Sequence, residues 1–259
     1  MRAALCLALA LLAGCAAAPP AEGPQVDSGT ITGSSSDPRN RARIRTELAA
    51  AYYGRGNMNI ALEELRLAVA ADPEFATAHG MFGLVYMELR ENALAQSSFQ
   101  RALRLAPDDP DINHNYGWFL CQTGREGESI AYFMRALRNP LYANPARSWS
   151  AAGTCEMRGG NLKAADGYLQ RALGIDANQP AAMLQLAQLR YRQGGLEEAR
   201  KLLARHAKLA EPSAESLWLA LRIERRLGQR TEELSYANQL RRRFPQSQEA
   251  QSLQRGTYD

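Results

Sequence analysis

Few side chains in this 259-residue sequence are suited to covalent or acid–base chemistry: it has four cysteines and three histidines. The histidines, His79, His114 and His206, lie far apart in the chain, and none belongs to a metalloprotease or phosphate-loop motif. The carboxylates of DPRN (37–40) and DDPD (108–111) precede helix-like segments, where Asp caps a helix and favours its dipole. We therefore expect no catalytic residue, metal site, cofactor or small-molecule substrate, and we predict that the protein is not an enzyme.

The first two cysteines belong to an N-terminal segment with the form of a secretory signal peptide. MRAALCLALALLAGC (1–15) has a positive charge at Arg2, then an apolar run and small residues, and it is too short to span a membrane stably. Its end, LAGC, resembles the bacterial lipobox, in which the cysteine becomes the first mature residue and carries acyl chains such as palmitate. We predict a signal peptide over 1–14, which leaves with Cys6, and a durable lipid anchor on Cys15. The alternative is a chance cysteine beside a signal peptide.

The residues that follow Cys15 predict where the protein goes. Ala16 stands where lipoproteins of the inner membrane typically have Asp, so by the same resemblance we expect an outer-membrane lipoprotein that faces the periplasm. Residues 16–41 are rich in Ala, Pro, Gly and Ser and lack a hydrophobic face. We therefore predict a lipidated N-terminus and flexible linker over 15–41, which would span about 25–30 Å on average.

The elements that position any functional side chain follow a repeat of 34 residues. The chain is rich in Ala, Leu, Arg and Gln with few β-branched residues, which favours an all-helical protein. Residues that recur at steps of 34 include Ala61 and Ala95, Ala68 and Ala102, Pro73 and Pro107, and Gly160, Gly194 and Gly228. A helix–turn–helix unit of this length is the tetratricopeptide repeat (TPR).

We predict six such repeats in an all-α, right-handed superhelical solenoid. The predicted repeats are 42–75, 76–109, 110–143, 146–179, 180–213 and 214–247, and the C-terminal tail is 248–259. Small residues at the eighth and twentieth repeat positions would let the two helices cross closely, and large residues would fill the space beside them. The sixth repeat departs from this pattern, with Leu221, Glu233 and Leu240 in place of small residues, as terminal repeats often do. The tail is expected to add a short covering helix.

The concave face of such an array is lined by the first helix of each repeat. Residues predicted to point into this groove are Tyr53, Leu84, Met87, His114, Trp118, Gln122, Met157, Leu184, Tyr191 and Trp218. Apolar residues are more frequent among them than a solvated face requires, and exposed apolar patches usually mark a partner site. The alternative for each residue is packing between repeats. The net charge of +4 is spread along the chain without a recognition motif, so we expect no nucleic-acid partner.

The remaining cysteines, Cys121 and Cys155, lie late in the first helices of the third and fourth repeats. First helices of adjacent repeats are neighbours, and the periplasm permits disulfides. We predict a disulfide that closes a loop of about 34 residues and contributes on the order of 3–4 kcal/mol. The alternative is two buried thiols.

NYGWFLCQTG (115–124), NPLYANPARS (139–148) and AAGTCEMRGGN (151–161), with the lipobox and the repeats, resemble the PilF/PilW family of type IV pilus biogenesis lipoproteins. The resemblance implies an outer-membrane pilotin that binds the pilus secretin or other pilus-assembly proteins and catalyses no reaction. It would bring the secretin to the outer membrane and promote its multimerisation, or support the stability of the pilus. It also implies that Cys15 is the lipid anchor and that Cys121 and Cys155 are paired. The alternative is a periplasmic TPR scaffold for another envelope assembly, such as outer-membrane protein insertion or cell-wall synthesis. A third alternative, an enzyme with its site in the groove, requires converging titratable groups that the sequence does not show.

The stretch NPLYANPARSW (139–149) increases the spacing between equivalent positions of the third and fourth repeats from 34 to 36 residues. Pro140 ends the preceding helix, and Pro145 suits the start of the next. We expect a longer inter-repeat turn, and we hypothesise that the nearby disulfide pins a junction that this turn loosens.

Overall fold

The computed structural model describes residues 37–258, and within them it contains thirteen α-helices and no strand. The predicted signal peptide, Cys15 and most of the predicted linker lie outside the described residues. The prediction of an all-α chain is confirmed for the described part.

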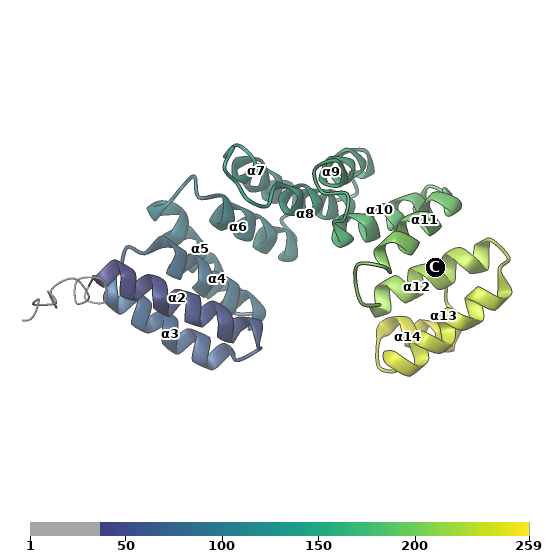
Figure 1. Ribbon diagram of the computed structural model, residues 1–259, viewed down its shortest axis with the longest axis horizontal. Coiled ribbons are helices and arrows are strands. Elements are labelled where there is room, and N and C mark those ends of the chain that lie inside the picture. Colours follow the sequence, from purple (N-terminus) through teal and green to yellow (C-terminus); the bar gives the residue numbers. More distant parts are fainter. Residues whose placement is uncertain (1–36, 259) are drawn as a thin grey trace, which may run out of the picture. The chain divides into compact units, whose positions relative to one another are not determined.

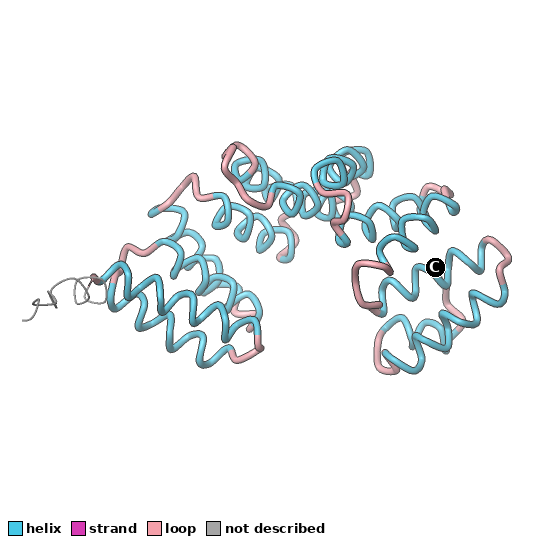
Figure 2. The backbone as a smooth tube through the Cα atoms, in the orientation of Figure 1, coloured by secondary structure: helices cyan, strands magenta, loops and turns pink. Residues whose placement is uncertain are grey.

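The helices form six pairs followed by one short helix (Figure 1). The pairs are α2 (Pro38–Gly54) with α3 (Met58–Ala71), α4 (Ala76–Glu88) with α5 (Asn92–Leu105), α6 (Pro110–Gln122) with α7 (Glu126–Ala136), α8 (Pro145–Arg158) with α9 (Leu162–Ile175), α10 (Pro180–Arg192) with α11 (Leu196–His206), and α12 (Ala214–Arg226) with α13 (Arg230–Arg243); α14 (Gln248–Arg255) follows. Short turns join the two helices of each pair (Figure 2). Within residues 38–258 the first helix of each pair contacts the first helix of the next, so the first helices form one continuous layer.

Helix starts coincide with predicted repeat starts at Ala76, Pro110, Pro180 and Ala214. At DDPD, the side chain of Asp109 accepts a hydrogen bond from the Ile112 backbone N–H at 2.9 Å and caps α6, as predicted. Residues 38–41 are helical, so the predicted end of the linker at residue 41 is wrong. Proline is favoured in the first turn of a helix, and Pro38 begins α2 here.

In the second and fourth pairs the two helices cross so closely that the eighth repeat position has no room for a side chain. A Cβ atom at Gly153 would lie 2.6 Å from Leu169 Cγ, and one at Gly83 would lie 2.7 Å from the Phe99 ring. Leu169 and Phe99 are fully buried and fill the space that the missing side chains leave. These two pairs are therefore held by a small residue on the first helix and a large residue on the second.

The turn between the paired helices requires a positive φ angle. Glycine supplies it in every pair except the second, as at Gly124, where φ is +80°. In the second pair the equivalent residue is Arg90, with φ of +61°. A side chain in this conformation costs about 1–2 kcal/mol, so the α4–α5 turn is locally strained.

The departures of the sixth repeat are explained by α14. Leu221 and Leu240 are fully buried, and they form one apolar cluster with Ala250 and Leu253 of α14. Larger side chains are needed here because α14 covers the end of the array in place of a further repeat. Glu233 is also buried, and both of its carboxylate oxygens form ion pairs at 2.9 Å, with arginines of α12 and α13.

The close crossing of α8 and α9 makes a prediction. Replacing Gly153 with Ala should lower the free energy of unfolding by about 1–2 kcal/mol, because overpacking costs about 1–3 kcal/mol and outweighs the gain in helix propensity. Replacing Gly167, in the same pair, should instead raise it by up to about 1 kcal/mol, since no atom lies within 4 Å of a Cβ there. Urea denaturation followed by circular dichroism measures both. Equal effects of the two substitutions would contradict the packing argument.

Candidate protein-binding site

Three cavities follow one another along the layer of first helices. The α2–α6 cavity, of 320 Å³, is lined by α2, α4 and α6 together with the residue that caps α6. The α6–α10 cavity, of 200 Å³, is lined by α6, α8 and the start of α10. The α10–α12 cavity, of 360 Å³, is lined by α10 and α12. Each cavity lies at a junction between neighbouring repeats, so together they form one candidate surface for a partner.

Three repeat positions supply side chains to all three cavities. The second position supplies Thr77, Asp111, Arg147, Ala181 and Glu215; the fifth supplies Thr46, Gly80, His114, Ser150 and Trp218; and the ninth supplies Ala50, Leu84, Trp118, Thr154, Gln188 and Arg222. These positions are three and four residues apart and lie on one face of a helix. The fold therefore presents the same face of every first helix to the surface.

The structure places the ten predicted groove residues in different environments. Those that line the three cavities are Leu84, His114, Trp118, Tyr191 and Trp218. Met87 and Gln122, again with Trp118, line a fourth cavity of 520 Å³ between the ends of α4 and α6. Tyr53, Met157 and Leu184 line none of these four cavities. Met157 and Leu184 are buried in the cluster that joins the fourth, fifth and sixth repeats, which corresponds to the packing alternative.

Sequence reasoning missed several polar residues that line the cavities. They include Asp111, Arg147, Ser150 and Arg222. The ten predicted residues are those that helical spacing turns inward, and eight of them are apolar or aromatic, unlike these four. The repeat phase alone identifies them, because each occupies the second, fifth or ninth position.

The imidazole of His114 lies in a buried polar chain beside the α6–α10 cavity. His114 Nδ1 lies 2.8 Å from Ser148 Oγ, and Ser148 Oγ donates to Tyr142 Oη at 3.0 Å. Burial, and secondly the positive charge of Arg147, lowers the pKa of His114 to about 3, so the imidazole is neutral at physiological pH. A histidine beside a serine is the arrangement of a nucleophile and its base. Here Ser148 is fully buried and its proton is engaged by Tyr142, so the chain has a structural role.

Cys121 of α6 and Cys155 of α8 are joined by a disulfide, with an S–S distance of 2.09 Å. Both residues are fully buried. The bond lies seven residues further along both helices than the His114–Ser148 contact, so α6 and α8 are linked twice on the same side. Two exposed hydrogen bonds also cross this junction: Arg147 donates to Asn115 at 3.3 Å, and Arg158 donates to Gln122 at 3.0 Å.

The longer turn between the third and fourth repeats, residues 139–144, has its own anchor. The Asn139 side chain accepts from the Leu141 N–H at 2.9 Å and tightens the turn. Leu141 is 90% exposed, whereas Tyr142 is 7% exposed and reaches the chain of Ser148 and His114. The turn is therefore held to α6 and α8 through Tyr142 as well as through the disulfide.

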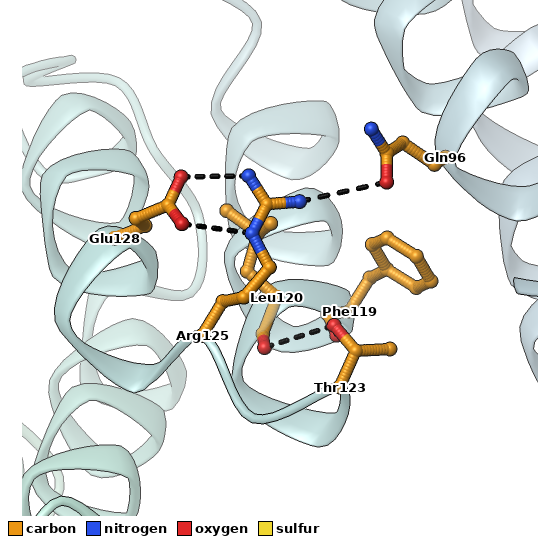
Figure 3. Close-up of polar contacts among 6 residues, drawn as sticks. All are labelled: Gln96, Phe119, Leu120, Thr123, Arg125 and Glu128. Atoms are coloured by element: carbon orange, nitrogen blue, oxygen red, sulfur yellow. Dashed lines mark hydrogen bonds and ion pairs between the residues drawn. The ribbon is translucent and has the colours of Figure 1, made fainter. Parts of the chain in front are cut away.

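The turn between α6 and α7 is tied to the preceding repeat (Figure 3). Arg125 donates from Nε and Nη2 to the two carboxylate oxygens of Glu128 at 2.8 and 2.6 Å, and from Nη1 to Gln96 of α5 at 3.5 Å. Thr123 Oγ1 donates to the carbonyl oxygen of Phe119 at 2.9 Å and closes the end of α6. Because Arg125 and Glu128 are largely exposed, the ion pair contributes little to stability, and its effect is to fix the turn.

Charge differs along the surface. The α2–α6 cavity carries the carboxylates of Glu47, Asp109 and Asp111 and no basic side chain. Burial raises the pKa of Asp111, and the neighbouring Asp109 adds to the rise. The α10–α12 cavity instead carries Arg192 and Arg222. The two ends of the surface therefore favour ligands of opposite charge.

Within residues 37–258 no helix combines the length and apolar character needed to cross a membrane. In the same residues, no group of three or more His, Cys, Asp or Glu side chains is arranged to hold a metal ion.

Comparisons with known proteins agree on one group of relatives. Models of the tetratricopeptide repeat match residues 81–143 and 157–222. The type IV pilus assembly protein PilF of Pseudomonas aeruginosa is 29% identical over 234 residues, a match that covers 88% of this chain and 93% of PilF. The crystal structure of PilW, a widely conserved type IV pilus biogenesis factor, has a TM-score of 0.74 and 33% identity over 82% of this chain and 97% of that one. A solved structure of P. aeruginosa PilF has a TM-score of 0.75 and 28% identity over 85% of this chain and 99% of that one.

The disulfide makes a second prediction. Replacing Cys121 and Cys155 together with Ala should lower the free energy of unfolding by about 3–4 kcal/mol, because the unfolded chain regains the freedom of a 34-residue loop. Urea denaturation of the oxidised protein and of the double variant measures the difference, and a reducing agent should affect only the former. Free thiols at both positions in protein isolated without a reducing agent would contradict the prediction of a disulfide.

The burial of the His114 imidazole leads to a third prediction. Between pH 6.5 and 3 the unfolded state binds a proton at His114 that the folded state does not. The free energy of unfolding is therefore unaffected by protonation of His114 above pH 6.5 and decreases as the pH falls below it. From pH 7 to pH 5 the free energy of unfolding should fall by about 2 kcal/mol more in the wild type than in His114→Gln. The control His79→Gln leaves His114 in place and should keep the wild-type response. The same pH response in all three proteins would contradict the assignment.

Proposed function

The chain belongs to the PilF/PilW family of type IV pilus biogenesis proteins, and from this membership we propose that it is a non-catalytic, lipid-anchored scaffold for the pilus secretin. In this proposal the scaffold binds secretin subunits in the periplasm, brings them to the outer membrane and promotes their assembly into the multimeric ring. The observation that carries the proposal is the match to PilW, which runs over 97% of that protein at 33% identity. The likeness therefore covers the whole repeat array and is more than a general similarity between TPR proteins.

The geometry supports a scaffold because the surface offers apolar, aromatic and charged side chains at successive repeat junctions. The Ser148–His114 contact beside the central cavity is buried. The imidazole has a pKa of about 3, which is too low for an effective general base at neutral pH. The cavities at successive repeat junctions suit an extended protein segment, because each junction receives a different part of it. The bonds between α6 and α8 hold the two helices that line the central cavity in fixed positions.

The lipid anchor is the part of the proposal that explains how the scaffold would bring the secretin to the outer membrane. Acylation of Cys15 would attach the protein to the outer membrane, so that a secretin subunit bound to the repeats shares the destination of the anchor. Loss of acylation should leave the repeats folded, since Cys15 precedes the first described helix by more than twenty residues.

The fourth prediction tests the function. In a deletion strain, and in a strain with Cys15→Ala, secretin multimers in the outer membrane should fall to a similar low level. The deletion strain lacks the protein, and in the Cys15→Ala strain the repeats remain folded but are no longer at the membrane. Immunoblots of unheated outer-membrane fractions measure the multimers, and twitching motility reports on the pilus. The matched control is Cys6→Ala, which removes a cysteine that the predicted signal peptide carries away, and it should behave as the wild type.

The two strains distinguish separate parts of the proposal. Normal multimer levels in the Cys15→Ala strain would show that the anchored-carrier mechanism is wrong. Normal multimers and normal motility in the deletion strain would show that the function lies elsewhere, as in a scaffold for outer-membrane protein insertion or cell-wall synthesis.

A further inference from the structure

The α10–α12 cavity combines aromatic walls with arginine side chains. It has a volume of 360 Å³, within the range of about 300–1,000 Å³ found for ligand sites. Tyr191 and Trp218 form its aromatic part, and the Trp218 ring is held in place by stacking on Tyr258 with a centroid distance of 5.6 Å. Arg192 and Arg222 line the same cavity.

Two positive charges meet at the Tyr191 ring, and a third follows Tyr191 in the chain. The guanidinium carbon of Arg222 lies 4.6 Å from the ring centroid, and that of Arg226 lies 5.0 Å from it. Arg226 also donates to the Tyr191 carbonyl oxygen at 3.3 Å. Arg192 follows Tyr191 directly in the chain and is exposed at the same cavity. The aromatic ring offers a partial attraction to each cation but does not neutralise the like charges that it brings together.

None of these three arginines forms an ion pair within the described residues, in contrast to their neighbours. Nearby arginines that are paired with carboxylates are Arg190, Arg200, Arg225 and Arg230. The one acidic residue at the cavity, Glu215, accepts a hydrogen bond from Gln188 and lies beyond ion-pair distance of the arginines. In addition, Nε of Arg222 is buried and has no hydrogen-bond partner in the structure. A buried donor of a charged group without a partner is costly, and the same guanidinium lines the cavity without a carboxylate partner.

We propose that this cavity binds the carboxylates of an acidic segment of a partner protein that also carries an aromatic or large apolar side chain. Arginine forms paired, charge-assisted hydrogen bonds with carboxylates, and Arg222 with Arg192 offers such donors at the rim of an aromatic pocket. The rings of Tyr191 and Trp218 would contact the apolar side chain of the same segment. The inference deepens the proposed function. It rests on that function in one respect, because it takes a protein segment as the ligand.

The fifth prediction uses the purified full repeat array and a pair of probes. One probe is a short dansyl-labelled peptide with phenylalanine and several aspartates, and the other has asparagine in place of each aspartate. Fluorescence anisotropy should show that the array binds the acidic peptide and binds the neutral one much more weakly, with an affinity for the acidic peptide that falls as salt rises. Arg222→Gln should weaken the binding of the acidic peptide by about tenfold. Arg192→Gln should weaken it by about threefold, because Arg192 is exposed.

The matched control is Arg242→Gln on the exposed face of α13, which removes the same charge and lines none of the cavities described above. It should leave the affinity unchanged, and circular dichroism should show a folded array for all variants. Should Arg222→Gln fail to fold, Arg192→Gln alone decides the question. Equal binding of both peptides, or wild-type affinity in both arginine variants, would overturn the proposal. Binding of phosphatidylglycerol vesicles but of neither peptide would overturn it in favour of a lipid ligand. None of these results depends on secretin multimers, so the inference and the proposed function can fail separately.

Discussion

The close crossing of the two helices in each pair is the constraint on which the rest of the structure depends. At Gly83 and Gly153 the partner side chain occupies the place of a Cβ atom, so the crossing cannot be relaxed without moving Phe99 or Leu169. This contact fixes the rotation of the first helix about its own axis. One face of that helix is committed to its partner, and the face that carries the second, fifth and ninth positions is turned to the surface with the cavities.

The junction between the third and fourth repeats shows how the array tolerates an irregular turn. Two extra residues would allow α8 to shift against α6, yet the disulfide, the chain from His114 through Ser148 to Tyr142 and two exposed hydrogen bonds all cross or border this junction. Tyr142 comes from the longer turn itself. That the disulfide pins this junction stays a hypothesis, and the turn itself contributes Tyr142 to the other bonds there.

The repeat phase was predictable from sequence because small residues and glycine turns recur at fixed steps, and it places helix starts such as Ala76 and Pro180 correctly. The lining of the surface was predictable only in part. Apolar character cannot distinguish Trp118, which lines a cavity, from Met157, which packs between repeats, because both satisfy the same helical spacing. Likewise, the positive φ of Arg90 gives no sign in the residue type, since the neighbouring turns, and not Arg90 itself, impose that conformation.

The same constraint explains why the surface can differ in charge from one end to the other. At Gly83 and Gly153 the eighth position must be small because a side chain of the partner helix occupies the space of a Cβ atom, so packing fixes the residue type there. The second and ninth positions line the cavities, where residues as different as Ala50 and Trp118 are accommodated. Asp111 and Arg222 are therefore compatible with one fold although they have opposite charges. On the proposed surface, the repeat would therefore determine where a partner binds, and the residues at these positions would determine which partner it is.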